Sequence, residues 1–229
     1  MEKKNKKFVG FYHYGVVLTY LSVIAAITGI CFSVGGNKDN LPWVGVICLM
    51  ISGVCDAFDG AVAKTRKNRT REDKMFGERI DSLSDLIAFG VAPVMIGFGM
   101  HINRWYYIPV YGLFVLCALI RLAYYDVTEE IRMDAEGGRR TFYEGLPVTN
   151  VAFILPIFYL VAVMFPIHHP ARNLTMLCGY VLIAFLFVLR FKMPKLGIKG
   201  LIIAMLTSVI VCSVLLYIDL QVIPCVHWS

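Results

Sequence analysis

The sequence predicts an all-α membrane protein: a polytopic transmembrane helix bundle of about seven spans, built as one integral membrane domain over residues 1–229. Two observations predict this class. Hydrophobic residues make up 58% of the 229-residue chain and charged residues only 17%, whereas soluble domains carry about 25% charged residues. The apolar residues also gather in stretches of about 20, the length that a helix needs to cross ~30 Å of hydrocarbon.

The expected spans cover roughly residues 14–34, 41–63, 80–101, 105–126, 147–166, 173–191 and 199–220. The first stretch is too long for a removable signal peptide and lacks a small-residue cleavage site. The seven cysteines lie mostly inside these stretches without metal-ligand spacing, so we interpret them as small buried apolar side chains.

Basic residues are concentrated in alternate loops. The first set lies before the first span and after the second, fourth and sixth: Lys3, Lys4, Lys6, Lys7, Lys64, Arg66, Lys67, Arg69, Arg71, Lys74, Arg79, Arg132, Arg139, Arg140, Arg190, Lys192, Lys195 and Lys199. The other loops carry Lys38, Arg104 and Arg172. By the positive-inside rule the N-terminus is cytoplasmic, and an odd number of spans places the C-terminal tail outside. Because the charge is divided among short loops, nucleic-acid binding is a poor interpretation of it.

Two pairs of carboxylates lie where the apolar stretches meet the basic loop after the second span. Asp56 and Asp59 are three residues apart, and Asp81 and Asp85 are four apart, so each pair lies on one helix face. An acid at the centre of a membrane helix costs roughly 2.5–3.5 kcal/mol, and such residues usually mark a functional site. We therefore expect the catalytic segment to be 56–85, at the cytoplasmic ends of the second and third spans.

Small residues accompany both pairs of acids. Gly60 and Ala63 continue the stripe of the first pair, and Gly77 precedes the second pair by one helical turn. Residues with little or no side chain let a ligand or a neighbouring helix approach the backbone closely. The loop between the two spans is short, so the helices are expected to be antiparallel neighbours whose acidic stripes face each other.

Carboxylate oxygens alone are suited to hard divalent cations, here Mg²⁺ or Mn²⁺. Two such ions about 3.5–4 Å apart can hold a diphosphate and stabilise its attacking and leaving oxygens. The alternative is that the acids form interfacial ion pairs with Lys64, Arg66 or Arg79. Ion pairing explains one or two of the acids, but it does not explain four acids with aligned glycines.

The order D-x2-D-G-x2-A…G-x3-D-x3-D resembles the signature of the CDP-alcohol phosphotransferase family. The matching residues are Asp56, Asp59, Gly60, Ala63, Gly77, Asp81 and Asp85. Lys64 stands where the family usually has arginine, which keeps the charge but loses the bidentate fork. The segment 65–76 is also longer than is usual in the family.

Further resemblance narrows the branch within this family. The segment IDSLSDLIAFGVAP, residues 80–93, resembles bacterial phosphatidylserine synthases, and it has Ser82 where phosphatidylglycerolphosphate synthases usually have proline. Residues 121–123 and 142–147 resemble two further synthase landmarks. The branch implies transfer of a phosphatidyl group from CDP-diacylglycerol to L-serine, giving phosphatidylserine and CMP, by a homodimer in a bacterial-type plasma membrane among membrane lipids.

The resemblance also assigns roles to residues. It implies that Asp85 is the general base and that metal is held by Asp56, Asp59, Asp81 and Asp85. The nucleotide-binding residues would be Asp56, Asp59, Gly60, Ala63, Lys64, Gly77 and Asp81.

The acceptor side has two candidate residues, each with an alternative interpretation. Arg121, inside the fourth span, is suited to bind a phosphate or the serine carboxylate, or else it forms a structural pair or extends to the interface. Asn150, one turn inside the fifth span, is either an acceptor ligand or the partner in an interhelical hydrogen bond.

Three rival functions remain. The nearest keeps the chemistry and changes the acceptor to inositol phosphate, glycerol 3-phosphate or choline. A cation transporter would also place acids in the membrane, but a transport pathway favours acids distributed across the bilayer, whereas these gather at one edge. A purely structural membrane subunit is the third.

Overall fold

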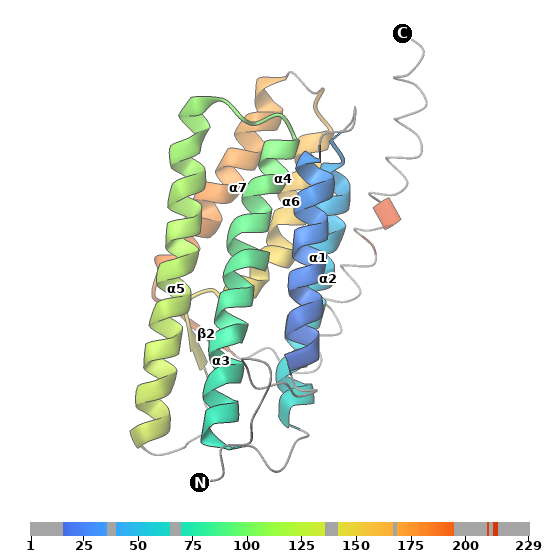
Figure 1. Cartoon of the computed structure of the whole chain (residues 1–229). Coiled ribbons are helices and arrows are strands. Elements are labelled where there is room, and N and C mark those ends of the chain that lie inside the picture. The colour runs from blue at the N-terminus through green and yellow to red at the C-terminus, as the bar shows by residue number, and fades with distance from the viewer. Residues whose placement is uncertain are drawn as a thin grey trace.

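The computed structural model describes residues 16–35, 40–64, 70–135, 142–166 and 169–194, together with residues 210, 213 and 214. Within these ranges the chain forms six helical rods that stand roughly parallel (Figure 1). Their bounds are α1 Val17–Val34, α2 Pro42–Lys64, a continuous rod of α3 Arg71–Asp85, η2 Leu86–Val91 and α4 Ala92–Gly99, then α5 Ile108–Ala135, α6 Val151–Val163 and α7 Pro170–Val188. Short 3₁₀ turns precede α5 and α6, at Trp105–Tyr107 (η3) and Val148–Asn150 (η4).

The helical membrane architecture is confirmed, with five helical segments long and apolar enough to cross a bilayer in the part of the chain that the structure describes. They are Val17–Val34, Pro42–Asp59, Met75–Gly99, Trp105–Ile131 and Pro170–Val188. These correspond to the first four and the sixth of the expected spans. The fifth expected span is a shorter apolar helix, Val148–Val163. The seventh lies outside the described residues except for positions 210, 213 and 214, which are helical.

The packing order of the rods brings the second and third spans to one side of the bundle. α1 and α2 form the most extensive helix pair, and α4 packs against both of them. α2 also contacts α6, α6 contacts α7, α7 contacts α5, and α5 closes the ring against η2. Close approach of α1 and α2 depends on small residues, because a Cβ added at Gly29 would lie 2.7 Å from the Cβ of Cys48. Small residues at such interfaces are characteristic of membrane helices.

The third rod changes its helical geometry directly after Asp85. Residues Leu86–Val91 form a π-helix, in which the N–H of Ala92 donates to the carbonyl of Ile87. Pro93 follows in the first turn of α4, and it lacks the N–H that a regular α-helix would use there. A π-turn inside an α-helix is often found at a functional site. Here it separates the polar segment α3 from the apolar segment α4.

A small antiparallel ribbon was not predicted by the sequence analysis, so the described chain is not strictly all-α. Strand β1, Phe142–Glu144, pairs with β2, Lys192–Pro194, with Tyr143 opposite Met193. The ribbon ends at Gly145, whose φ of 79° favours glycine and whose N–H donates to the carbonyl of Phe191 at 2.7 Å. It therefore joins the segment before α6 to the segment after α7.

Candidate metal and substrate site

Two acids lie near the C-terminal end of α2. Pro42 is the first residue of this 23-residue helix, a position where the missing N–H of proline is harmless. The apolar residues that follow carry the helix through the bundle, and Asp56 and Asp59 come in its last three turns. Asp59 is buried, and Asp56 is half-buried. α2 thus delivers both carboxylates to the end of the bundle from which α3 starts.

The second pair of acids lies on α3, whose start is fixed by local sequence. The side chain of Thr70 accepts a hydrogen bond from the N–H of Asp73 at 3.0 Å, and the Asp73 carboxylate accepts from the N–H of Thr70 at 3.3 Å. This reciprocal capping box satisfies two backbone donors that would otherwise lack a helical partner. Asp81 and Asp85 follow on the same face, in the last two turns before the π-helix.

Three of the four predicted acids converge. Asp56, Asp81 and Asp85 each offer one carboxylate oxygen, and these atoms all lie within 4.8 Å of one another. They come from α2 and from the end of α3, as the spacing of the acids predicts. Like charges so close repel strongly in a partly buried site unless a cation or protons lie between them.

Asp59, the fourth acid, is oriented toward another helix. Its Oδ2 accepts a hydrogen bond from the hydroxyl of Thr19 on α1 at 3.2 Å. Asp59 nevertheless interacts electrostatically with Asp56 and Asp81, so it borders the cluster of three. Thr19 is a contributor that the sequence analysis missed, because nothing in the sequence indicates which face of α1 meets α2.

The small and basic residues of the predicted nucleotide site are only partly described. Gly60, Ala63 and Lys64 belong to the last turns of α2, but their side-chain surroundings lie outside the described part of the structure. Gly77 lies on α3, half-buried, one turn before Asp81. These positions agree with a continuous stripe on each helix, and their predicted contacts with a nucleotide remain a prediction.

The two acceptor candidates border the same end of the bundle. Arg121 on α5 is buried, its Nε–H donates to the carbonyl of Leu146 at 3.0 Å, and its guanidinium carbon lies 5.9 Å from the ring centroid of Tyr125. Asn150 is buried at the end of η4. That short helix packs against α2, α5 and η2, so it adjoins the helices that carry the acids.

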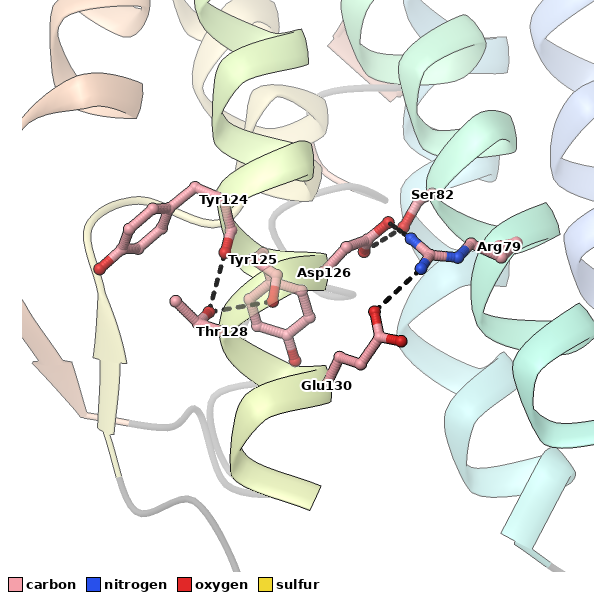
Figure 2. Close-up of polar contacts among 7 residues, drawn as sticks. All are labelled: Arg79, Ser82, Tyr124, Tyr125, Asp126, Thr128 and Glu130. Carbon is pink, nitrogen blue, oxygen red and sulfur yellow. Dashed lines mark hydrogen bonds and ion pairs between the residues drawn. The ribbon is translucent and has the colours of Figure 1, made fainter. Parts of the chain in front are cut away.

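A polar network between α3 and α5 was not predicted (Figure 2). The guanidinium of Arg79 donates to Asp126 at 3.4 Å and to Glu130 at 3.0 Å, and the hydroxyl of Ser82 donates to Asp126 at 2.6 Å. The ion pairs of Arg79 in the described chain thus go to α5 and not to the clustered acids, against the alternative that Arg79 neutralises the site. The signal that could have found the network is the acidic run at the end of α5, Asp126 to Glu130.

Two features of the cluster fit a divalent cation: the chemistry of its donor atoms, and a buried carboxylate oxygen that lacks a hydrogen-bond partner among the described residues. All three of its side chains offer carboxylate oxygens, which hard cations prefer. The Oδ1 of Asp81 is buried and has no hydrogen-bond partner among the described residues. A buried carboxylate oxygen without a partner is costly, and a bound cation would satisfy it. The residues present can therefore hold a metal ion.

Comparisons with known proteins identify the family of this chain. Residues 13–210 match the CDP-alcohol phosphatidyltransferase family. Among similar proteins, the CDP-diacylglycerol–serine O-phosphatidyltransferase of Saccharomyces cerevisiae is 38% identical over 115 residues, which are 49% of this chain and 40% of the relative. The archaetidylserine synthase of Methanothermobacter thermautotrophicus is 31% identical over 157 residues, or 68% of this chain and 61% of the relative.

A third relative is the CDP-diacylglycerol–serine O-phosphatidyltransferase of Helicobacter pylori, 37% identical over 89 residues, which are 38% of this chain and 34% of that protein. The chain thus spans less than two thirds of the length of each of these relatives. The family match covers most of the chain, including both pairs of acids and the helices that carry them. This protein belongs to the CDP-alcohol phosphatidyltransferase family.

Proposed function

We propose that this protein transfers the phosphatidyl group of CDP-diacylglycerol to L-serine, releasing CMP and forming phosphatidylserine. The observation that carries the proposal is the convergence of Asp56, Asp81 and Asp85, from two helices, within 4.8 Å. Family membership supplies the reaction class, a phosphatidyl transfer from a CDP-alcohol. A cluster of carboxylates at one end of the bundle suits a diphosphate that reaches the site from a lipid held in the bilayer.

Two observations support serine as the acceptor. The similar proteins include serine O-phosphatidyltransferases and an archaetidylserine synthase. The helix segment 80–93 also resembles the serine branch, with Ser82 where a related branch usually has proline. The assay below therefore compares serine with other acceptor alcohols.

In the proposed site Asp56, Asp59, Asp81 and Asp85 hold Mg²⁺ or Mn²⁺ as a two-metal site. Asp59 keeps one oxygen for this role while its other oxygen accepts from Thr19. When bound, the metal supplies positive charge that neutralises the diphosphate and stabilises the departing phosphate oxygen. Without it the acids would repel both the substrate and one another.

The chain's own residues hold the donor. The acyl chains stay in the bilayer, and the cytidine diphosphate lies against Gly60, Ala63 and Gly77, where the absence of long side chains permits close approach to the backbone. Lys64, at the last position of α2, contacts a phosphate as a point charge. The diphosphate is then held in line between the two acidic helices.

Asp85 acts as the general base in this reaction. It takes the proton of the serine hydroxyl as that oxygen forms a bond to the lipid-side phosphorus. The bond from this phosphorus to the bridging oxygen breaks, and the electron pair leaves with CMP. Asp56, Asp59 and Asp81 act mainly as ligands.

Arg121 and Asn150 orient the acceptor. The Nε–H of Arg121 donates to the Leu146 carbonyl. We assign the guanidinium of Arg121, a group with five N–H donors, to binding of the serine carboxylate. Asn150 at the start of α6 is assigned a hydrogen bond to the same acceptor. Their burial beside the helices of the site supports these roles over a purely interfacial one for Arg121.

The location follows from charge and composition. Five candidate spans make the chain an integral membrane protein, and the loops at the acidic end carry most of its lysines and arginines. By the positive-inside rule we place the N-terminus and the active site at the cytoplasmic face of a bacterial-type plasma membrane. We also propose that the protein is a homodimer, because the family resemblance implies one.

The decisive assay uses purified protein in lipid nanodiscs that contain CDP-diacylglycerol. CMP release is measured with Mg²⁺ or Mn²⁺, with and without L-serine, and an Asp81→Asn preparation is the control for contaminating activity. The expected result is CMP release that requires both metal and serine. Release with inositol phosphate, glycerol 3-phosphate or choline, but not with serine, would replace the acceptor and keep the chemistry. Metal-dependent ion flux without CMP release would favour a transporter.

A further inference from the structure

The network between α3 and α5 lies directly beside the clustered acids. Ser82 follows Asp81 in the chain, so any force on the Ser82 side chain acts on the same turn of α3. Its hydroxyl donates to Oδ1 of Asp126 at 2.6 Å, and Oδ2 of Asp126 accepts from Arg79 at 3.4 Å. In Figure 2 the Ser82 and Arg79 side chains reach from one helix toward Asp126 and Glu130 on the other.

Apolar packing covers α3 only in part. Met75 and Leu83 are 44% and 64% exposed, whereas Phe76 and Ile80 are half-buried and α3 also packs against α1. Beyond Asp85 the rod continues as a π-helix, so the segment that carries the acids joins the packed part of the rod through an irregular turn. The rotation of α3 about its axis, which decides where Asp81 and Asp85 point, therefore depends on polar contacts as well as on this partial apolar packing.

The negative charge of Asp126 has an electrostatic cost at this position. It interacts electrostatically with Asp81, so it adds another negative charge next to acids that already repel one another. A hydrogen bond from a hydroxyl to a carboxylate is short and roughly twice as strong as a neutral one. Both oxygens of Asp126 are used, one for Ser82 and one for Arg79, as expected of a group that holds α3 in place.

We propose that Asp126 is a positioning residue that orients the metal-binding carboxylates Asp81 and Asp85 through its hydrogen bond with Ser82. This inference rests on the proposed function, because it assumes that the cluster binds a divalent cation. Residues that orient metal ligands through hydrogen bonds typically change metal affinity or activity by about 10–100-fold when they are replaced. Asp126 would do so from a neighbouring helix, through the residue next to the ligand.

The test measures Mn²⁺ binding directly, from the free Mn²⁺ signal in electron paramagnetic resonance, on the full chain in nanodiscs without serine. Ser82→Ala and Asp126→Ala are each expected to weaken Mn²⁺ binding by about tenfold or more. Ser82→Thr keeps a hydroxyl donor and should bind Mn²⁺ nearly as the unmodified protein does. The double variant should lose no more than the worse single variant, because both changes remove the same bond.

Glu130→Gln is the matched control. Glu130 shares Arg79 with Asp126 but makes no bond to Ser82, and it is largely exposed, so its change should leave Mn²⁺ binding within about twofold. Size-exclusion profiles establish that each variant is folded. If Asp126→Ala does not fold, the comparison of Ser82→Ala with Ser82→Thr decides the question alone. Asp126→Asn, which keeps an acceptor oxygen for Ser82, is then the variant used at position 126.

Two results would overturn the inference. One is unchanged Mn²⁺ binding in Ser82→Ala and, where it folds, in Asp126→Ala. The other is a change confined to the apparent KM for serine, which would make Asp126 an acceptor contact. Failure of the proposed function is distinguishable, because the unmodified protein would then bind no Mn²⁺ or release no CMP, whereas failure of this inference leaves both intact.

Discussion

The two ends of the helix bundle differ in the kind of polar groups that they contain. At the end opposite the acids, the hydroxyl of Tyr180 donates to the carbonyl of Pro93 at 2.6 Å and that of Tyr111 donates to the carbonyl of Ile102 at 2.8 Å. At the acidic end, three carboxylates converge within 4.8 Å and a buried oxygen of Asp81 has no partner among the described residues. The far end also has buried polar atoms without a partner among the described residues, on Ser33, Trp43 and Arg172. The acidic end is instead distinguished by like charges that converge, which a bound cation would stabilise.

Packing follows the same division. A Cβ added at Gly97 would lie 2.7 Å from the hydroxyl oxygens of both Tyr111 and Tyr180, so the far end is tightly packed around Gly97. On the acidic side, α3 exposes Leu83 and Met75 and is held across to α5 by polar contacts. Substitutions at the two ends should therefore separate activity from stability, and the following predictions test that separation in order of decreasing effect.

The largest effect is expected for Asp81→Asn or Asp56→Asn. Each removes a charge from the cluster, so metal-dependent turnover should be nearly abolished. The thermal unfolding temperature without metal should stay the same or rise, because a repulsion between carboxylates is removed. CMP release and thermal unfolding in detergent measure the two quantities. Full activity of either variant at ordinary metal concentration would remove that residue from the site.

Asp85→Asn should separate the base from the ligands. The amide keeps the size of the side chain but cannot accept the serine proton, and loss of a general base typically costs about 10²–10⁴-fold in rate. Binding of CDP-diacylglycerol at saturating metal should persist, with some loss of metal affinity. Donor binding and CMP release are compared in the same preparation. Near-normal turnover would refute the base assignment, and complete loss of donor binding would make Asp85 chiefly a ligand.

At the opposite end, Gly97→Ala should act on stability alone. The added methyl group collides with two hydroxyls that are already hydrogen-bonded, and overpacking of this kind costs roughly 1–3 kcal/mol. Turnover per folded molecule should not change. Gly112→Ala is the control, because nothing lies within 4 Å of its added Cβ. Equal unfolding temperatures for the two variants would show that the far end is not tightly packed.

The smallest effect is expected for Lys64. If it contacts a phosphate of the donor, Lys64→Ala should raise the apparent KM for CDP-diacylglycerol several-fold with little change in stability. Lys64→Arg should be tolerated, since it introduces the side chain that the family usually has. Initial rates over a range of donor concentrations test both variants. An unchanged alanine variant would show that Lys64 is only a solvated charge at the end of α2.

The sequence alone determined the parts of this protein that depend on local pattern. The length of the apolar stretches predicted the membrane helices, because crossing hydrocarbon requires a nearly fixed number of residues. The spacing of Asp81 and Asp85 placed both on one face of α3, and the short loop made the second and third spans neighbours, which pack through α2, η2 and α4. Those local facts were enough to bring Asp56, Asp81 and Asp85 together.

Only the tertiary structure decided which helix each side chain meets. Residues three apart on a helix differ by about 60° in direction, and the rotation of α2 lets Asp56 face α3 while Asp59 accepts from Thr19 on α1. The bond from Ser82 to Asp126 joins residues 44 apart in the chain, and the β1–β2 ribbon joins segments still further apart. Such contacts depend on the packing of whole helices against one another, which local spacing does not specify.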